Sequence, residues 1–135
     1  MSITDAIPAL LAGNAVVLRP DNQSALTALS AISLLDEAGL PEGVLQVVLG
    51  DGPTIGNAVL ELADYVCFTG STATGRSVAQ HAASRRVGAS LCLGCKNAMY
   101  VPEDANVAQG RTGALRPRFP SPGQPCLSTS GAVPP

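Results

Sequence analysis

Two glycine-rich strings in this sequence have the composition of loops that bind phosphate. They are Gly50-Asp51-Gly52-Pro53-Thr54-Ile55-Gly56 and Phe68-Thr69-Gly70-Ser71-Thr72-Ala73-Thr74-Gly75-Arg76. Glycine lets a backbone approach a ligand closely, and a helix N-terminus presents free N–H groups and a positive dipole end to an anion. Neither string is GxGxxG or a Walker motif, and such glycines also suit ordinary tight turns in an α/β sheet. Spacing alone leaves both interpretations open.

The cysteines are the second set of reactive side chains: Cys67, Cys92, Cys95 and Cys126. Cys92 and Cys95 form a CxxC pair, but zinc usually takes two such pairs and a redox CxxC usually opens a helix. We expect neither metal nor redox chemistry, because Cys67, Cys126 and His81 make no second pair and Cys92 falls in a predicted strand. Cys67 is expected to behave as a small buried hydrophobe, and His81 as a solvated helix residue.

Apolar periodicity predicts the elements that position these residues. Strands are expected at 15–18, 44–49, 64–69, 89–93 and 99–101. Helices are expected from a Ser24 N-cap to a stop at Gly39, from the first glycine string to about Leu62, and from about Thr74 to Arg86, where Arg85 and Arg86 suit the dipole. Strands that alternate with helices imply right-handed crossovers and a parallel sheet with helices on both faces.

Composition divides the chain and excludes several classes of function. Residues 1–107 carry the strand and helix patterns, whereas residues 108–135 are rich in proline and are expected to be a poorly ordered tail. The hydrophobic fraction of 46% indicates a folded domain, and a net charge of −2 with one lysine, Lys96, argues against nucleic acid. The sequence shows no membrane-spanning run and no targeting signal, which favours a cytoplasmic location.

Several longer strings share their order and spacing with one enzyme family. They are Pro8-Ala9-Leu10-Leu11-Ala12-Gly13-Asn14-Ala15-Val16-Val17-Leu18-Arg19-Pro20, then Glu37-Ala38-Gly39-Leu40-Pro41-Glu42-Gly43-Val44, Phe68-Thr69-Gly70-Ser71-Thr72 and Leu91-Cys92-Leu93-Gly94-Cys95-Lys96-Asn97. Phe119, Gly123-Gln124 and Cys126 complete the set. Together they resemble the NAD(P)-dependent aldehyde dehydrogenases, nearest to the branch that acts on succinate semialdehyde. The resemblance implies a partial Rossmann-like cofactor-binding domain, with residues 108–135 at the start of the catalytic domain.

The resemblance also implies which residues meet the cofactor. Arg19 occupies the place of a basic residue that contacts the adenosine ribose, and Asn22 the place where NAD-preferring members hold a glutamate. Loss of that carboxylate removes repulsion toward a 2′-phosphate, so NADP is expected over NAD. The positions that meet or flank the pyrophosphate and nicotinamide are Gly52, Gly56, Gly70, Ser71, Leu93 and Gly94.

In that family a cysteine thiolate attacks the aldehyde, hydride passes to the nicotinamide, and a glutamate activates water to release the acid. Cys126 matches the nucleophile position, and Cys92 stands at the glutamate position 34 residues earlier, since 126 − 92 = 34. A thiol is a poor substitute for a carboxylate base, and the segment with the family's oxyanion-hole asparagine is absent. We therefore expect the chain alone to be inactive.

Three functions remain open at this point. The chain could be an inactive part of an aldehyde dehydrogenase, a module that binds the nucleotide without catalysis, or half of a split enzyme that needs a partner chain. Exposed sheet edges would favour self-association in each case.

Overall fold

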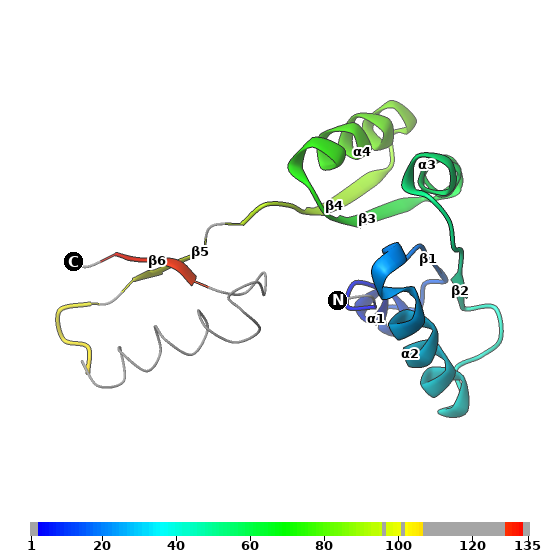
Figure 1. Ribbon diagram of the computed structural model, residues 1–135, viewed down its shortest axis with the longest axis horizontal. Helices are drawn as coiled ribbons and strands as arrows, with labels where there is room; N and C mark the ends of the chain where they lie inside the picture. The colour runs from blue at the N-terminus through cyan, green and yellow to red at the C-terminus, as the bar shows by residue number, and fades with distance from the viewer. Residues whose placement is uncertain (1–2, 96, 101, 107–128, 134–135) are drawn as a thin grey trace. The chain divides into compact units, whose positions relative to one another are not determined.

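The computed structural model describes residues 3–95, 97–100, 102–106 and 129–133 (Figure 1). The chain divides into two compact units, one of residues 1–69 with 73–91 and the other of residues 70–72 with 92–135. The boundary expected near residue 107 stays a prediction. Each unit is described by itself.

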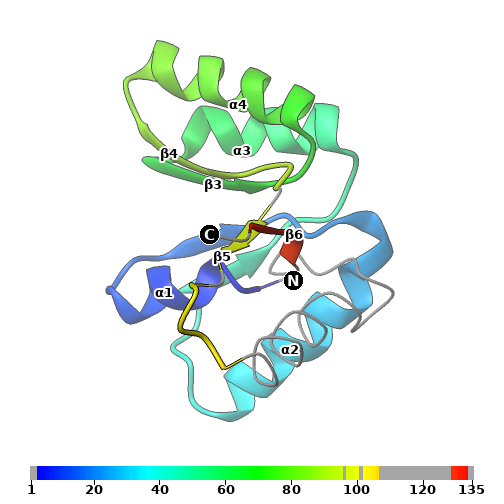
Figure 2. The ribbon, with the colours of Figure 1, turned by 90° about the vertical axis from the view of Figure 1, so that its left-hand side faces the viewer.

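The first unit alternates strands and helices as the sequence predicts. Its elements are α1 (Ala6–Leu11), β1 (Val16–Leu18), the 3-10 turn η1 (Asn22–Ser24), α2 (Ala25–Glu37), β2 (Leu45–Val47), the π turn η2 (Gly52–Gly56), α3 (Asn57–Leu62), β3 (Tyr65–Thr69), α4 (Thr72–Arg85) and β4 (Gly88–Cys92). Strands β1–β4 lie between α1 and α2 on one side and α3 and α4 on the other (Figures 1 and 2). This is a partial Rossmann-like α/β arrangement.

The strands of this unit pair two by two. β1 runs parallel to β2 with Val16 opposite Leu45 and Leu18 opposite Val47, and β3 neighbours β4 in a second two-stranded sheet. The sequence predicts one parallel sheet, whereas β1 and β2 hold only three residues each and make a short ladder. Tyr65 stabilises the other pair, because its hydroxyl lies 2.7 Å from Ser90 Oγ on β4.

Two helices end in the same hydrogen-bonded motif. At the end of α2, Gly39 N donates to Asp36 O and Leu40 N to Leu35 O; at the end of α4, Arg86 N donates to Ala83 O and Val87 N to Ala82 O. Both are Schellman motifs, which need a left-handed residue just after the helix. Gly39 meets this need with φ +93°, as predicted, whereas Arg86 is a non-glycine residue at φ 60°.

The start of α2 differs from its prediction. Ser24 occupies the N-cap position, but its side chain makes no capping bond and its Oγ donates to Asp21 O. The Asp21 carboxylate instead accepts from Gln23 N at 2.9 Å and caps the preceding turn η1. A carboxylate three residues upstream therefore begins the helical segment.

The core of the described part is built from alanine, valine and leucine side chains. Its buried apolar residues are Ala6, Ala28, Leu45, Val66, Val78 and Ala82. Large apolar side chains are exposed, among them Leu11 at 85%, Leu26 at 80% and Leu62 at 83%. Among the described residues, no helix is both long and apolar enough to cross a membrane.

The second unit contains a parallel pair of strands. β5 (Asn97–Tyr100) pairs with β6 (Thr129–Val133), with Ala98 opposite Gly131, Tyr100 opposite Val133 and a register shift next to Asn97. β5 confirms the strand expected near residues 99–101. The sequence analysis missed β6, whose five residues include no proline and so keep all their backbone donors. Residues 108–128 and 134–135 of the predicted tail lie outside the described part.

Candidate functional site

Arg19 joins the ends of the two parallel strands of the first unit. The residue follows β1, and its Nε and Nη2 donate to the carbonyl oxygen of Gly50, beyond β2, at 3.1 and 2.6 Å. Nη2 also donates to Asn22 Oδ1 at 3.1 Å. Ligands of α/β proteins bind beyond the carboxyl ends of parallel strands. At such an edge, Arg19 thus contacts both Asn22, a second predicted cofactor residue, and the first glycine string.

Asp51 caps the turn that follows. Its Oδ2 accepts from Thr54 N at 2.9 Å, and its backbone carbonyl accepts from Ile55 N at 3.0 Å. The hydrogen bonds from Thr54 lower the pKa of the Asp51 carboxyl below its ordinary value of 3.8, with a small further effect of Arg19. An anion of the protein itself therefore occupies the N-terminus of η2, which begins at Gly52 and ends at Gly56.

The sequence analysis does not predict the capping role of Asp51, although its residue type and the following proline indicate an N-cap. Aspartate is a preferred N-cap, and a proline in the first helical turn follows it at Pro53. Gly50 just before it has a strict requirement for glycine, because φ is +148° and a Cβ would lie 2.5 Å from Ile55 Cγ1. This first string therefore forms a turn that Asp51 caps and that requires glycine at residue 50.

The second glycine string lies against the segment with the predicted catalytic position. Gly70 N donates to Cys92 O at 3.0 Å, and a Cβ on Gly94 would meet Thr72 Oγ1 at 3.4 Å, an ordinary contact. Ser71 is exposed and comes directly before α4. The second unit thus brings together Gly70, Ser71, Leu93 and Gly94, four residues expected at the pyrophosphate and nicotinamide.

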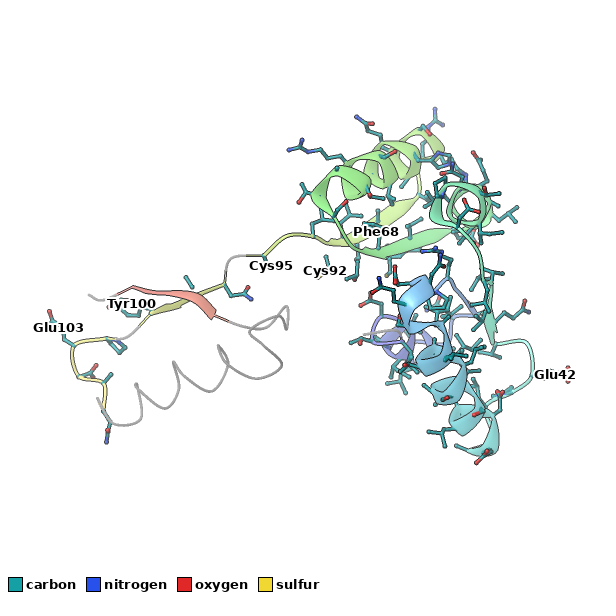
Figure 3. The ribbon with its side chains drawn as sticks, in the orientation of Figure 1. Glu42, Phe68, Cys92, Cys95, Tyr100 and Glu103 are labelled. Atoms are coloured by element: carbon teal, nitrogen blue, oxygen red, sulfur yellow. The ribbon has the colours of Figure 1, made fainter. Side chains whose placement is uncertain are left out.

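The two cysteines of the CxxC pair differ in surroundings (Figure 3). Cys92 is half-buried at the end of β4, while Cys95 is exposed and its Sγ lies 3.2 Å from Leu93 O. Cys92 offers a thiol where the family resemblance places a carboxylate. Cys126, which is expected at the nucleophile position, and Lys96 lie outside the described residues. Over the residues that the structure describes, no three His, Cys, Asp or Glu side chains gather where they could hold a metal ion.

Two further sequence interpretations need correction. Cys67 is exposed, because strand β3 alternates and it is the neighbouring Val66 that is buried. His81 lies on α4 with Nε2 3.1 Å from Glu61 Oε1 on α3, so it has an acidic partner. Arg85 reaches back to α3 as well, and donates to Leu60 O and Ala63 O at 2.5 and 2.7 Å. These contacts join α3 to α4.

Comparison with known proteins identifies the family. Residues 1–133 match the aldehyde dehydrogenase family. The chain belongs to this family. A Mycolicibacterium smegmatis protein named "Putative succinate-semialdehyde dehydrogenase (NADP+)" is 48% identical over 128 residues, which cover 95% of this chain and 25% of that protein. The chain therefore spans about a quarter of the length of the curated relatives that it matches.

Solved aldehyde dehydrogenase structures share the fold. An E. coli NADP-dependent enzyme matches with a TM-score of 0.83 at 35% identity, over 94% of this chain and 27% of that one. The NAD+ complex of an aldehyde dehydrogenase from Bacillus cereus matches with a TM-score of 0.81 at 36% identity, over 93% and 26%. The solved structures that this aldehyde dehydrogenase chain matches therefore include one named as NADP-dependent and one determined as a complex with NAD+.

Proposed function

We propose that this chain is the cofactor-binding part of an NADP-dependent aldehyde dehydrogenase that acts on a semialdehyde such as succinate semialdehyde. The observation that carries the NADP preference is the Asn22 amide, held beside Arg19 at the edge of β1 and β2. An amide has donors for a phosphate, whereas a glutamate there would repel it. The name of the M. smegmatis relative supports both the cofactor and the substrate class.

The site residues divide between the two ends of the dinucleotide. Arg19 and Asn22 serve the adenosine end, with Gly52 and Gly56 forming the neighbouring turn. Gly70 and Ser71 serve the pyrophosphate, because the string before α4 lacks a carboxylate such as Asp51 at the matching place. The last two positions, beside the nicotinamide, are Leu93 and Gly94. Bound NADP would supply the hydride acceptor.

The proposal includes no turnover by this chain alone. Cys92 stands where we place the carboxylate that would activate water, and a thiol is a poor substitute for a carboxylate base. Cys126 is proposed as the nucleophile position. A cytoplasmic location forms part of the proposal, supported by the free thiols of Cys67, Cys92 and Cys95 in the described part. Binding of nucleic acid is not part of it, given the net charge of −2.

Thermal unfolding with and without dinucleotide tests this function. Circular dichroism of the purified chain should show a cooperative transition that NADP raises more than NAD at equal concentration, because a ligand stabilises the state that it binds. A folded chain whose transition neither dinucleotide moves would disprove cofactor binding. Formation of NADPH from succinate semialdehyde by the chain alone would disprove the absence of turnover.

A second function, as one part of a split enzyme, is favoured by the apolar side chains that the described part leaves exposed, such as Leu11, Leu26 and Leu62. Such surfaces mark sites of association. A polypeptide with the remaining family segments, or a second copy of this chain through its strand edges, would cover them. Sedimentation of the chain alone detects self-association. Sedimentation after the second polypeptide is added detects a complex with that polypeptide. NADPH formation only in the mixture would support the split enzyme.

A further inference from the structure

We propose that Cys92 and Cys95 form a reversible disulfide by exchange with a small-molecule disulfide, in which Cys95 reacts first and Cys92 then closes the bond. The pair is thus a modification site that responds to an oxidising change in its surroundings. From the sequence we expect no redox chemistry here, because a reactive CxxC usually opens a helix. The structure changes this expectation, since a disulfide also forms where one thiol is accessible and a second can reach it. The inference is independent of the proposed function.

The two cysteines lie on either side of a strand end, on the segment that leaves β4 (Figure 3). Cys92 is the last residue of β4, and residues 93–95 follow it without regular structure. A fully extended chain would hold their Cα atoms about 10 Å apart, whereas a disulfide needs about 4.4–6.8 Å. The segment between them can bend, because it has left the strand and contains Gly94, a residue with wide conformational freedom.

The side chain of Cys95 is already turned back along the chain. Its thiol donates to the carbonyl oxygen of Leu93, the residue next to Cys92, at 3.2 Å. A thiol is a weak donor, so this bond is easily exchanged for another contact. The backbone of Cys92 is held more firmly, because its carbonyl accepts from Gly70 N at 3.0 Å. Closure of the disulfide therefore moves Cys95 toward a fixed Cys92.

The different exposure of the two thiols sets the order of the reaction. Cys95 is exposed and Cys92 is half-buried, so an external disulfide such as oxidised glutathione meets Cys95 first. The Cys95 thiolate attacks one sulfur of that disulfide, the S–S bond breaks, and one glutathione leaves and takes up the proton that Cys95 lost. The Cys92 thiolate then attacks Cys95 Sγ and displaces the second glutathione, which takes up the proton from Cys92. In sum, two protein thiols are oxidised and one glutathione disulfide is reduced to two thiols.

The sequence makes this reaction easy to follow in the full chain. Trypsin cuts after Arg86 and after Lys96, so residues 87–96 form one peptide that holds Cys92 and Cys95 and no other cysteine. The folded chain is treated with oxidised glutathione at pH 8, quenched with an alkylating reagent, digested without reductant and analysed by mass spectrometry. We expect this peptide to lose two hydrogen atoms and to carry neither glutathione nor the alkylating group. Dithiothreitol should reverse the change.

Two variants test the order of attack. Cys92→Ser keeps the exposed thiol, so its peptide should stop at one bound glutathione. Cys95→Ser keeps the half-buried thiol, and its peptide should gain glutathione more slowly, by about threefold or more. The same two variants unfolded in urea are the matched control, because both thiols are then equally accessible. Their rates in urea should be equal, which shows that the difference comes from the fold.

Distinct results would overturn the proposal. A peptide 87–96 of the unmodified chain that carries two glutathiones, or that stays fully alkylated, would show that Cys92 and Cys95 do not form a disulfide. A disulfide that joins this peptide to the peptide of Cys67 or of Cys126 would show that the partner is a different thiol. If Cys95→Ser reacts in the folded state as fast as Cys92→Ser, the order of attack is wrong.

Discussion

The backbone N–H of Gly70 donates a hydrogen bond to the backbone carbonyl of Cys92, with 3.0 Å between the two atoms. This bond joins the turn before α4 to the end of β4, at the residue that we propose for the family's glutamate position. The side chain of Cys92 takes no part in it. The turn that we assign to the pyrophosphate is therefore independent of the chemistry at Cys92, and the two can be changed separately.

Replacement of Gly70 by proline removes the donor of this bond. We expect Gly70→Pro to lower the free energy of unfolding by about 0.5–1.5 kcal/mol, the net value of one such bond, and to weaken NADP binding. Urea unfolding and a binding titration measure the two effects. The control is Cys92→Ser, which keeps the carbonyl and should leave both unchanged. Equal losses in the two variants would contradict this account of the bond.

Glycine is required at residue 50 but not at residue 52. Gly50→Ala places a methyl group 2.5 Å from Ile55 Cγ1 at a φ of +148°, so we expect a loss of about 1–3 kcal/mol in unfolding free energy. Gly52→Ala is the matched control, since its Cβ would meet nothing within 4 Å. Chemical denaturation of both variants measures the difference. Similar stabilities of the two would show that the clash is absent.

The left-handed residue after α4 offers a stabilising substitution. Arg86 adopts φ 60° in the motif where α2 has Gly39. Arg86→Gly should raise the unfolding free energy by up to about 1 kcal/mol, because glycine enters this region without a Cβ penalty. Gly39→Ala, which has open space around its Cβ, should lower it by about as much. Thermal melts of the two variants should move in opposite directions; a lower melting temperature for Arg86→Gly would refute the prediction.

Because the Asp51 carboxylate caps η2, the stability of the folded chain depends on pH in the acid range. The pKa of this carboxyl is lowered in the folded chain by the Thr54 hydrogen bonds, from 3.8. The folded state therefore prefers the charged form, and its stabilising contribution is complete above pH 3.8 and is lost as the pH falls through the lower folded pKa. We expect Asp51→Ala to destabilise the chain at pH 6, by an amount that shrinks as the pH falls below 3.8. A pH-independent difference in melting temperature would exclude this mechanism.

The reactivity of Cys67 should be suppressed. Although Cys67 is exposed as a residue, partial desolvation of its thiol and, second, the negative charge of Asp5 raise the pKa of this thiol above 9.0. Less thiolate is then present at pH 8, so alkylation of the Cys67 peptide, followed by mass spectrometry, should be slower than that of a free thiol. Asp5→Asn should accelerate it in part. Thr69→Val, which removes the Thr69 Oγ1 bond to Asp5 Oδ2 but keeps the charge, should not. Acceleration by both would point to loosened structure instead.

Sequence reasoning found the features that depend on neighbours along the chain. Gly39 ends its helix and the strands at β1, β2, β3 and β4 appear where apolar runs predict them, because periodicity and glycine stops are local. The contacts that shape the site join distant residues. Arg19 meets Gly50 across 31 positions, and Arg85 meets Leu60 across 25. A basic residue near a strand end can bind a ligand or a backbone carbonyl equally well, and only the folded structure shows which of the two it contacts.

The buried alanines of the core restrict which amino-acid substitutions this protein tolerates. Ala6, Ala28 and Ala82 are buried, with Ala28 fully enclosed. A larger side chain there would overpack the interior, while glycine, the one smaller residue, would loosen a helix in each case. Random mutagenesis followed by selection for folded chains should therefore return alanine at these three positions. The sites that tolerate least change in this protein are its smallest side chains.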